Sequence, residues 1–173
     1  SAHNKTLDPI NRAHSPEDFS DPNQRAKERG LCVATHLIFG LPGEDREMMM
    51  ETVRQVAVSG VDAIKIHQLC VYKGAPMEMD YRLGNLKLLD EDYYVELVAD
   101  AIELLPPDMV IMRLVAEGKK EELIAPTWSY DKYSVIDKIE HELLRRKTKQ
   151  GSRFPFTTPA VNTVSCEHAI PSL

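Results

Sequence analysis

The chain has 173 residues, of which 43% are hydrophobic and 28% are charged, as is ordinary for a globular domain with its own core. Its 21 Lys and Arg against 27 Asp and Glu give a formal net charge of −6, which argues against a surface that coats nucleic acid, although one local basic patch would still leave RNA open as a substrate. No apolar run is long enough to span a bilayer and no signal peptide precedes the first expected element, so we expect a cytoplasmic protein without a membrane partner.

The first expected elements are a helix and a strand. Residues 15–18, Ser-Pro-Glu-Asp, carry a helix-start signal, and Asp21-Pro22 repeats it. Because a proline inside a helix removes a backbone hydrogen bond, we expect a short turn and then a helix over about 22–29, closed by Gly30. Residues 31–39 are almost continuously apolar, which predicts a parallel strand covered on both faces.

The alternation of helix and strand then continues. Apolar residues at helical spacing mark the helices, and short apolar runs mark the strands. The expected order is a tight turn at 40–43, a helix ending at Gly60, a strand at 61–69, a long connection, a helix from Asp90 to Pro106, and a strand at 109–114. Strand–helix–strand–helix–strand is typical of a parallel α/β domain.

The pattern changes after the third strand. Trp128 precedes an expected helix at 131–146, and the sequence beyond Gln150 loses periodicity and is rich in Pro, Thr and Ser. Three parallel strands with few partners leave a sheet edge open, which indicates a truncated barrel. We therefore predict an α/β fold, an incomplete parallel barrel over 1–115, with a helical extension over 116–150 and an irregular tail over 151–173.

Ligands of parallel α/β folds meet the carboxyl ends of the strands, here 36–43, 65–70 and 113–118. At the 40–43 turn, Glu44 and Asp45 begin the next helix and would repel a phosphate, so a neutral or zwitterionic ligand is expected there. Lys65 is a candidate for Schiff-base chemistry or, more simply, a member of an ion pair inside the barrel.

Two further groups of residues have a functional and a plainer explanation. His36, His67 and Cys70 could hold zinc, but nothing in their spacing enforces a metal site, and hydrogen-bonded interior residues are the commoner explanation. Arg12 could bind a carboxylate through both guanidinium nitrogens or be a solvated loop arginine.

Segments 7–15, 36–44 and 60–67, in that order, resemble the later part of radical SAM enzymes. The subgroup is the bacterial one related to the oxygen-independent coproporphyrinogen oxidases and the Elongator catalytic subunit. Residues 124–128 and 150–151 resemble its carboxyl-terminal extension. The resemblance implies the second half of a partial TIM barrel.

The same resemblance implies an enzyme that reductively cleaves S-adenosylmethionine on a 4Fe–4S cluster held by a CxxxCxxC loop. This sequence has no such loop, and its three cysteines cannot supply one. The cluster ligands are therefore expected outside this chain, which begins with Ser1 rather than Met and would be inactive alone. The implied partners are the amino-terminal half of the barrel, a substrate, and an electron donor such as a flavodoxin or ferredoxin.

Several positions match the family's pattern one by one. The resemblance assigns Arg12 to the methionine carboxylate or ribose, and His36 to the ribose, although many relatives have Asp at that position. Lys65 and His67 would face the substrate as candidate catalytic residues, and no residue is a predicted metal ligand. The residues expected along the adenine are Leu37, Ile38, Gly40, Gln68 and Leu69.

Two hypotheses from other classes are kept beside this one. The first is a lyase that forms a Schiff base on Lys65. The second is a non-catalytic scaffold that presents the extension around Trp128 to a partner.

Overall fold

The computed structural model describes residues 1–7, 10–12 and 17–154. Its elements, in chain order, are α1 (Asn4–Leu7), α2 (Glu17–Glu28), β1 (Ala34–Phe39), α3 (Arg46–Val58), β2 (Ala63–Gln68), β3 (Val71–Tyr72), α4 (Met77–Arg82), α5 (Glu91–Leu104), β4 (Val110–Arg113), β5 (Leu123–Ala125), the 3₁₀ helix η1 (Thr127–Tyr130) and α6 (Lys132–Arg146). In this part of the chain, no helix has the length and apolar character needed to cross a membrane.

The main sheet contains three parallel strands in the order β1-β2-β4. Helices α3 and α5 pack on one face, where Phe39, Ile64 and Ile66 are at most 1% exposed. The opposite face, which we call the inner face, is open: Ile38 is 36% exposed and Val110 51%. The prediction that residues 31–39 are covered on both faces is therefore wrong for this chain, because buried and exposed residues alternate along β1.

Local capping explains where the two central helices begin. The Asp45 carboxylate accepts a hydrogen bond from Met48 N at 2.9 Å, and Asp90 accepts one from Tyr93 N at the same distance. Helix α2 begins earlier than expected and contains Pro22. The missing backbone bond is tolerated in its second turn, and an ion pair between Arg25 and Asp21 spans the proline.

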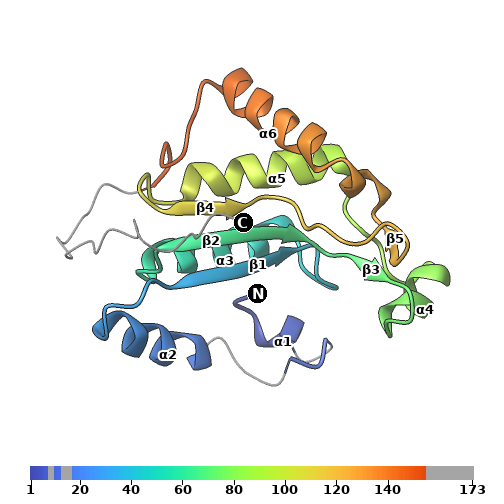
Figure 1. Ribbon diagram of the computed structural model, residues 1–173, viewed down its shortest axis with the longest axis horizontal. Coiled ribbons are helices and arrows are strands. Elements are labelled where there is room, and N and C mark those ends of the chain that lie inside the picture. The colour runs from blue at the N-terminus through green and yellow to red at the C-terminus, as the bar shows by residue number, and fades with distance from the viewer. Residues whose placement is uncertain (8–9, 13–16, 155–173) are drawn as a thin grey trace.

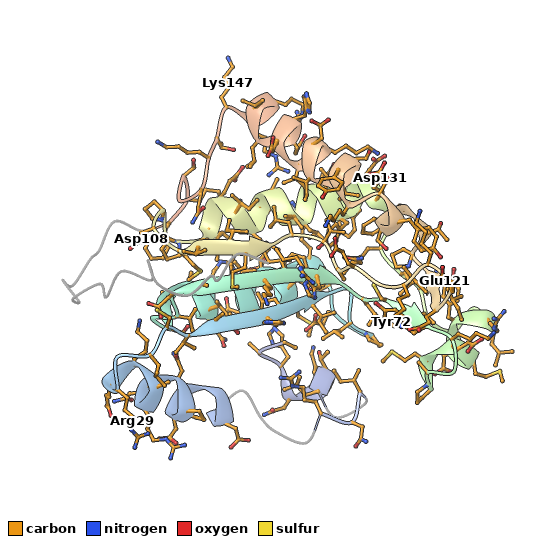
Figure 2. The ribbon with its side chains drawn as sticks, viewed as in Figure 1. Arg29, Tyr72, Asp108, Glu121, Asp131 and Lys147 are labelled. Carbon is orange, nitrogen blue, oxygen red and sulfur yellow. The ribbon has the colours of Figure 1, made fainter. Side chains whose placement is uncertain are left out.

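A second helical layer covers α5. Figure 1 shows α6 lying along the outer side of α5, with both helices on the β4 side of the sheet and α1 and α2 on the β1 side. Val135 and Ile139 of α6 are at most 1% exposed and belong to the main core. In Figure 2, Asp131 marks the beginning of α6, and Lys147 projects from its far end.

Charged side chains fasten this layer. Arg146 of α6 donates to Asp100 at 2.8 Å and to Glu103 at 3.3 Å, both of which are buried carboxylates of α5. Arg46 of α3 also pairs with Asp100. The segment after α6 follows the same surface, since Arg153 N donates to the Glu103 carbonyl at 2.8 Å.

The long connection after β2 has structure that the sequence analysis did not predict. Strand β3 pairs with β5 in an antiparallel two-stranded sheet, and α4 follows β3 directly. Figure 1 shows this small sheet at the end toward which β1 and β2 point. Such pairing joins residues about fifty positions apart, and neither strand is longer than three residues. Strands this short produce no periodic pattern in the sequence.

Candidate functional site

The inner face carries a row of basic side chains across all three strands. His36 of β1 is in register with Lys65 of β2, and Lys65 is in register with Arg113 of β4. A bulge shifts the β2–β4 register after Ile64, so that Met112 is passed over and Arg113 comes opposite Lys65. We call His36, Lys65 and Arg113 the basic row.

His67 lies one step farther along β2 on the same face. Its ring meets that of His36 edge to face, with centroids 5.8 Å apart. Burial and the positive charges of Arg113, His36 and Lys65 lower the pKa of His67 to about 4. Burial and the charges of Lys65 and Arg113 also lower the pKa of His36. Both imidazoles are therefore neutral at pH 7, and the Nε2 atom of His67 is buried without a hydrogen-bond partner among the described residues.

A cavity of about 820 Å³ runs beside β1, and we call it the edge cavity. Its wall includes Leu37, from the core side of the strand, and His36 and Ile38, from the inner face. Because β1 is an edge strand of the main sheet, the cavity follows a strand edge whose backbone has no neighbouring strand in the described structure. The amino-terminal segment and helices α2 and α3 complete the wall.

Arg12 reaches this cavity from the amino-terminal segment. Asn11 adopts a left-handed conformation with φ of 55°, and Arg12 N donates to the Leu7 carbonyl at 3.0 Å. The segment is held on α3, where Ala2 N donates to Thr52 Oγ1 at 3.0 Å. The structure thus brings Arg12, His36, Leu37, Ile38 and His67 to one cavity wall.

The other predicted adenine neighbours lie elsewhere. Gln68 is 3% exposed and its amide binds both backbone groups of Ala116, at 2.9 and 3.3 Å, which anchors the loop after β4. Leu69 N donates to the Phe39 carbonyl at 2.8 Å, and Gly40 N contacts Met49 Sδ at 3.3 Å. None of these three residues lines the edge cavity.

Lys65 has a different environment from the ion pair that was expected as its simpler explanation. Within the described part of the chain, no carboxylate lies within ion-pair distance of Lys65 or Arg113. Cys70, the third residue of the hypothetical zinc set, is a free thiol whose pKa is raised by burial. Among residues 1–7, 10–12 and 17–154, no three His, Cys, Asp or Glu side chains gather in a way that could hold a metal ion.

Sequence reasoning placed Arg113 among the strand-end residues 113–118 but gave it no role of its own. The sequence places it at the end of a strand, but its neighbour across the sheet depends on the bulge. A regular register would have placed Met112 opposite Lys65. The apolar sequence at 109–114 does not reveal the bulge, because the extra residue differs from its neighbours only in how it pairs with β2.

An open parallel sheet with helices on one face and polar side chains on the other is the architecture of part of an α/β barrel. A solved structure supports this class: the archaeal Methanocaldococcus infernus Elp3 with a deleted N-terminus superimposes with a TM-score of 0.75 at 20% identity, over 87% of this chain and 35% of that one. The prediction of an incomplete α/β barrel with a helical extension is confirmed.

Sequence comparisons agree with this class. Residues 61–145 match the radical SAM C-terminal domain. The Bacillus subtilis protein YtqA is 42% identical over 88% of this chain and 47% of its own length. A Methanocaldococcus jannaschii tRNA uridine(34) acetyltransferase is 28% identical over 60% of this chain and 20% of its own length. These similarities support a C-terminal part of a radical SAM-like protein, and the chain spans about half the length of YtqA.

Proposed function

We propose that this chain forms part of the barrel wall of an enzyme that reductively cleaves S-adenosylmethionine on a 4Fe–4S cluster. The observation that carries the proposal is the inner face, where His36, Ile38 and His67 stand on parallel strands whose opposite face is sealed by helices. In barrels of this kind, the functional residues stand at the carboxyl ends of the strands. The match of residues 61–145 to the radical SAM C-terminal domain supports the choice of cofactor.

The residues present fit S-adenosylmethionine. Ile38 offers an apolar surface to an adenine ring, and the neutral His36 can exchange hydrogen bonds with a ribose. The unpartnered Nε2 of His67 is a buried polar atom that a ligand could satisfy. Arg12 would hold the methionine carboxylate from the amino-terminal segment. When bound to a reduced cluster, the cofactor supplies one-electron chemistry, and this chain's residues position it.

The cluster does not fit the described residues. The sequence contains no CxxxCxxC loop, and no metal-binding group of His, Cys, Asp or Glu occurs among the residues that the structure describes. We therefore place the cluster ligands, and the docking surface for a flavodoxin or ferredoxin, in a part of the protein outside this chain.

The remainder of the barrel would dock along β1. A strand placed there would pair with the backbone edge of β1 and cover the edge cavity, whose wall receives side chains from both faces of β1. This arrangement would close His36, Ile38 and His67 inside a barrel. The likeness to the tRNA uridine(34) acetyltransferase supports RNA as the substrate, which stays a prediction.

A lyase that uses Lys65 is the second candidate. The observation in its favour is that no carboxylate neutralises Lys65 within the described structure, so its amine is free to approach a carbonyl substrate. Reduction with borohydride in the presence of a carbonyl substrate would trap an adduct on Lys65. Activity that persists in the Lys65→Ala variant would exclude this candidate.

Two experiments test the main proposal. The coding DNA upstream of Ser1 should contain an in-frame CxxxCxxC after a predicted strand, and its absence would overturn the proposal. Binding of S-adenosylmethionine to the reconstituted barrel should weaken in His36→Ala and remain unchanged in His141→Ala. His141 is an exposed histidine of α6, so this control has lost the same ring at a distance from the inner face.

A further inference from the structure

The basic row has no counter-charge in the described structure. The three strands of the main sheet have the sequences ATHLIF, AIKIHQ and VIMR, which contain no acidic residue. The nearby carboxylate of Asp62, just before β2, is paired with Lys27 and accepts from Val33 N at 2.8 Å. The charged groups that lower the pKa of His67 are Arg113, His36 and Lys65, all of which are basic.

The fold holds these cations together at a cost. Like charges directly opposite each other on neighbouring strands are destabilising, and Lys65 and Arg113 occupy such positions. The bulge after Ile64 creates this opposition, since the regular register would place the uncharged Met112 there. Adjacent strands lie about 4.8 Å apart, so the row extends over roughly 10 Å. Bulges are over-represented next to active sites, where they re-aim a side chain, and an anionic ligand at this position would supply the missing opposite charge.

We propose that the basic row binds an anionic group, a carboxylate or a phosphate, of the molecule that is transformed inside the barrel. This inference rests on the proposed function and deepens it by assigning the chemical class of the substrate. Arg113 offers a planar fork of N–H donors and Lys65 a compact ammonium, which together suit a tetrahedral or planar oxyanion. His36, at the other end of the row, adds a neutral ring N–H.

The placement of the anion is specific to this row. The turn at 40–43, at the carboxyl end of β1, is followed by Glu44 and Asp45, and the Asp45 carboxylate already caps α3. Negative charge at that helix start disfavours a second anion. The substrate's anionic group is thus directed to Lys65 of β2 and Arg113 of β4, and the cofactor to the β1 side.

The test is a titration of the 173-residue chain with inorganic phosphate, and separately with acetate, at constant ionic strength and without S-adenosylmethionine. The histidine ring protons are followed by NMR. Saturable shifts of the His36 and His67 signals are expected, and bound anion should raise the pKa of His67, because negative charge favours the imidazolium. The anion that binds with the higher affinity identifies the substrate group as phosphate or carboxylate.

Variants locate the binding. Lys65→Gln and Arg113→Gln should each weaken the apparent affinity about tenfold, since each removes a charge-assisted hydrogen bond. Lys65→Arg keeps the positive charge and should retain binding. This result would show that Lys65→Gln weakens binding through the lost charge and not through unfolding. Lys87→Gln is the matched control, because Lys87 is exposed and lies outside the row.

Three results would overturn the inference. The first is the absence of saturable shifts in the unmodified chain with either anion. The second is equal affinity in Lys65→Gln, Arg113→Gln and Lys87→Gln. The third is displacement of the anion by S-adenosylmethionine, which would assign the row to the cofactor's own carboxylate and leave the proposed cofactor chemistry intact. Conversely, a gene without a CxxxCxxC motif would remove the proposed function without changing the anion titration.

Discussion

A Cβ atom built on Gly40 would stand 2.9 Å from Leu89 Cγ, which is closer than side chains normally approach. Gly40 directly follows β1 with a φ of +83°, and Leu89 lies just before α5. The Leu89 carbonyl also accepts the indole N–H of Trp128 at 3.1 Å. The end of β1, the start of α5 and the 3₁₀ helix η1 therefore meet at one packed point.

Gly40→Ala should destabilise the chain by about 3 kcal/mol, because left-handed backbone strain of about 1–2 kcal/mol is joined by a steric overlap. Gly43→Ala is the matched control: its φ is +79°, and nothing lies within 4 Å of a Cβ there. It should cost only the strain. Urea unfolding measures both variants, and equal losses would show that Leu89 moves away without cost.

Arg146→Met should destabilise the attachment of α6 by about 3 kcal/mol. The substitution removes one positive partner from each of the buried Asp100 and Glu103, and a buried carboxylate whose charge is less fully compensated is costly. Arg145→Met is the control, since Arg145 is exposed and, among the residues that the structure describes, pairs only with Glu142. It should change the free energy of unfolding by less than about 1 kcal/mol. Urea unfolding followed by the fluorescence of the single tryptophan, Trp128, reports the difference, and similar losses would contradict the assigned role.

His67 should make stability depend on pH. Its folded pKa of about 4 lies below the ordinary value of 6.5, so the unfolded chain binds this proton first. Stability should therefore fall as the pH is lowered from about 6.5 to about 4. In His67→Gln this slope should be smaller, whereas His141→Gln, on the exposed surface of α6, should retain it. Denaturant midpoints between pH 7 and pH 4 give the slopes, and an unchanged slope in His67→Gln would refute the assignment.

The pKa of His67 should also depend on the charge of Lys65. Its positive charge is one cause of the lowered pKa of His67, so Lys65→Met should move that pKa upward, toward 6.5. An NMR titration of the ring protons measures the shift. Lys87→Met should leave the pKa unchanged. A downward shift in Lys65→Met would mean that burial increases when the lysine is removed.

Tyr94→Phe should cost about 1–2 kcal/mol. The Tyr94 hydroxyl donates to the Leu114 carbonyl at 2.7 Å, and its ring is fully buried against Phe39 and Trp128. The substitution leaves a carbonyl group without its partner and preserves the ring. Thermal unfolding measures the loss, and Tyr133→Phe, at a tyrosine that is 74% exposed, should be neutral in it. Neutrality of Tyr94→Phe would indicate that water replaces the hydroxyl.

Sequence alone predicted the order of the main elements because each signal is local. Asp45 and Asp90 cap helices from the adjacent residue, and the apolar runs of β1 and β2 identify strands without knowledge of their neighbours. The start of α2 was misplaced, because the cost of Pro22 had to be weighed against contacts of the whole helix. The β3–β5 pair was missed because two strands this short are specified by each other.

The sequence likewise predicted one part of the candidate site, and the tertiary structure decided the rest. The motif segments around Arg12, His36 and Lys65 were sufficient to indicate the family and to nominate residues, since those patterns lie within short stretches of chain. Their assembly was decided by tertiary structure. The edge cavity is lined by segments that are far apart in the sequence. The side chain of Gln68 is hydrogen-bonded to the backbone of Ala116, and Arg113 lies opposite Lys65 only because of a bulge. Register between strands is set by packing and backbone pairing across the sheet, which one-dimensional periodicity does not encode.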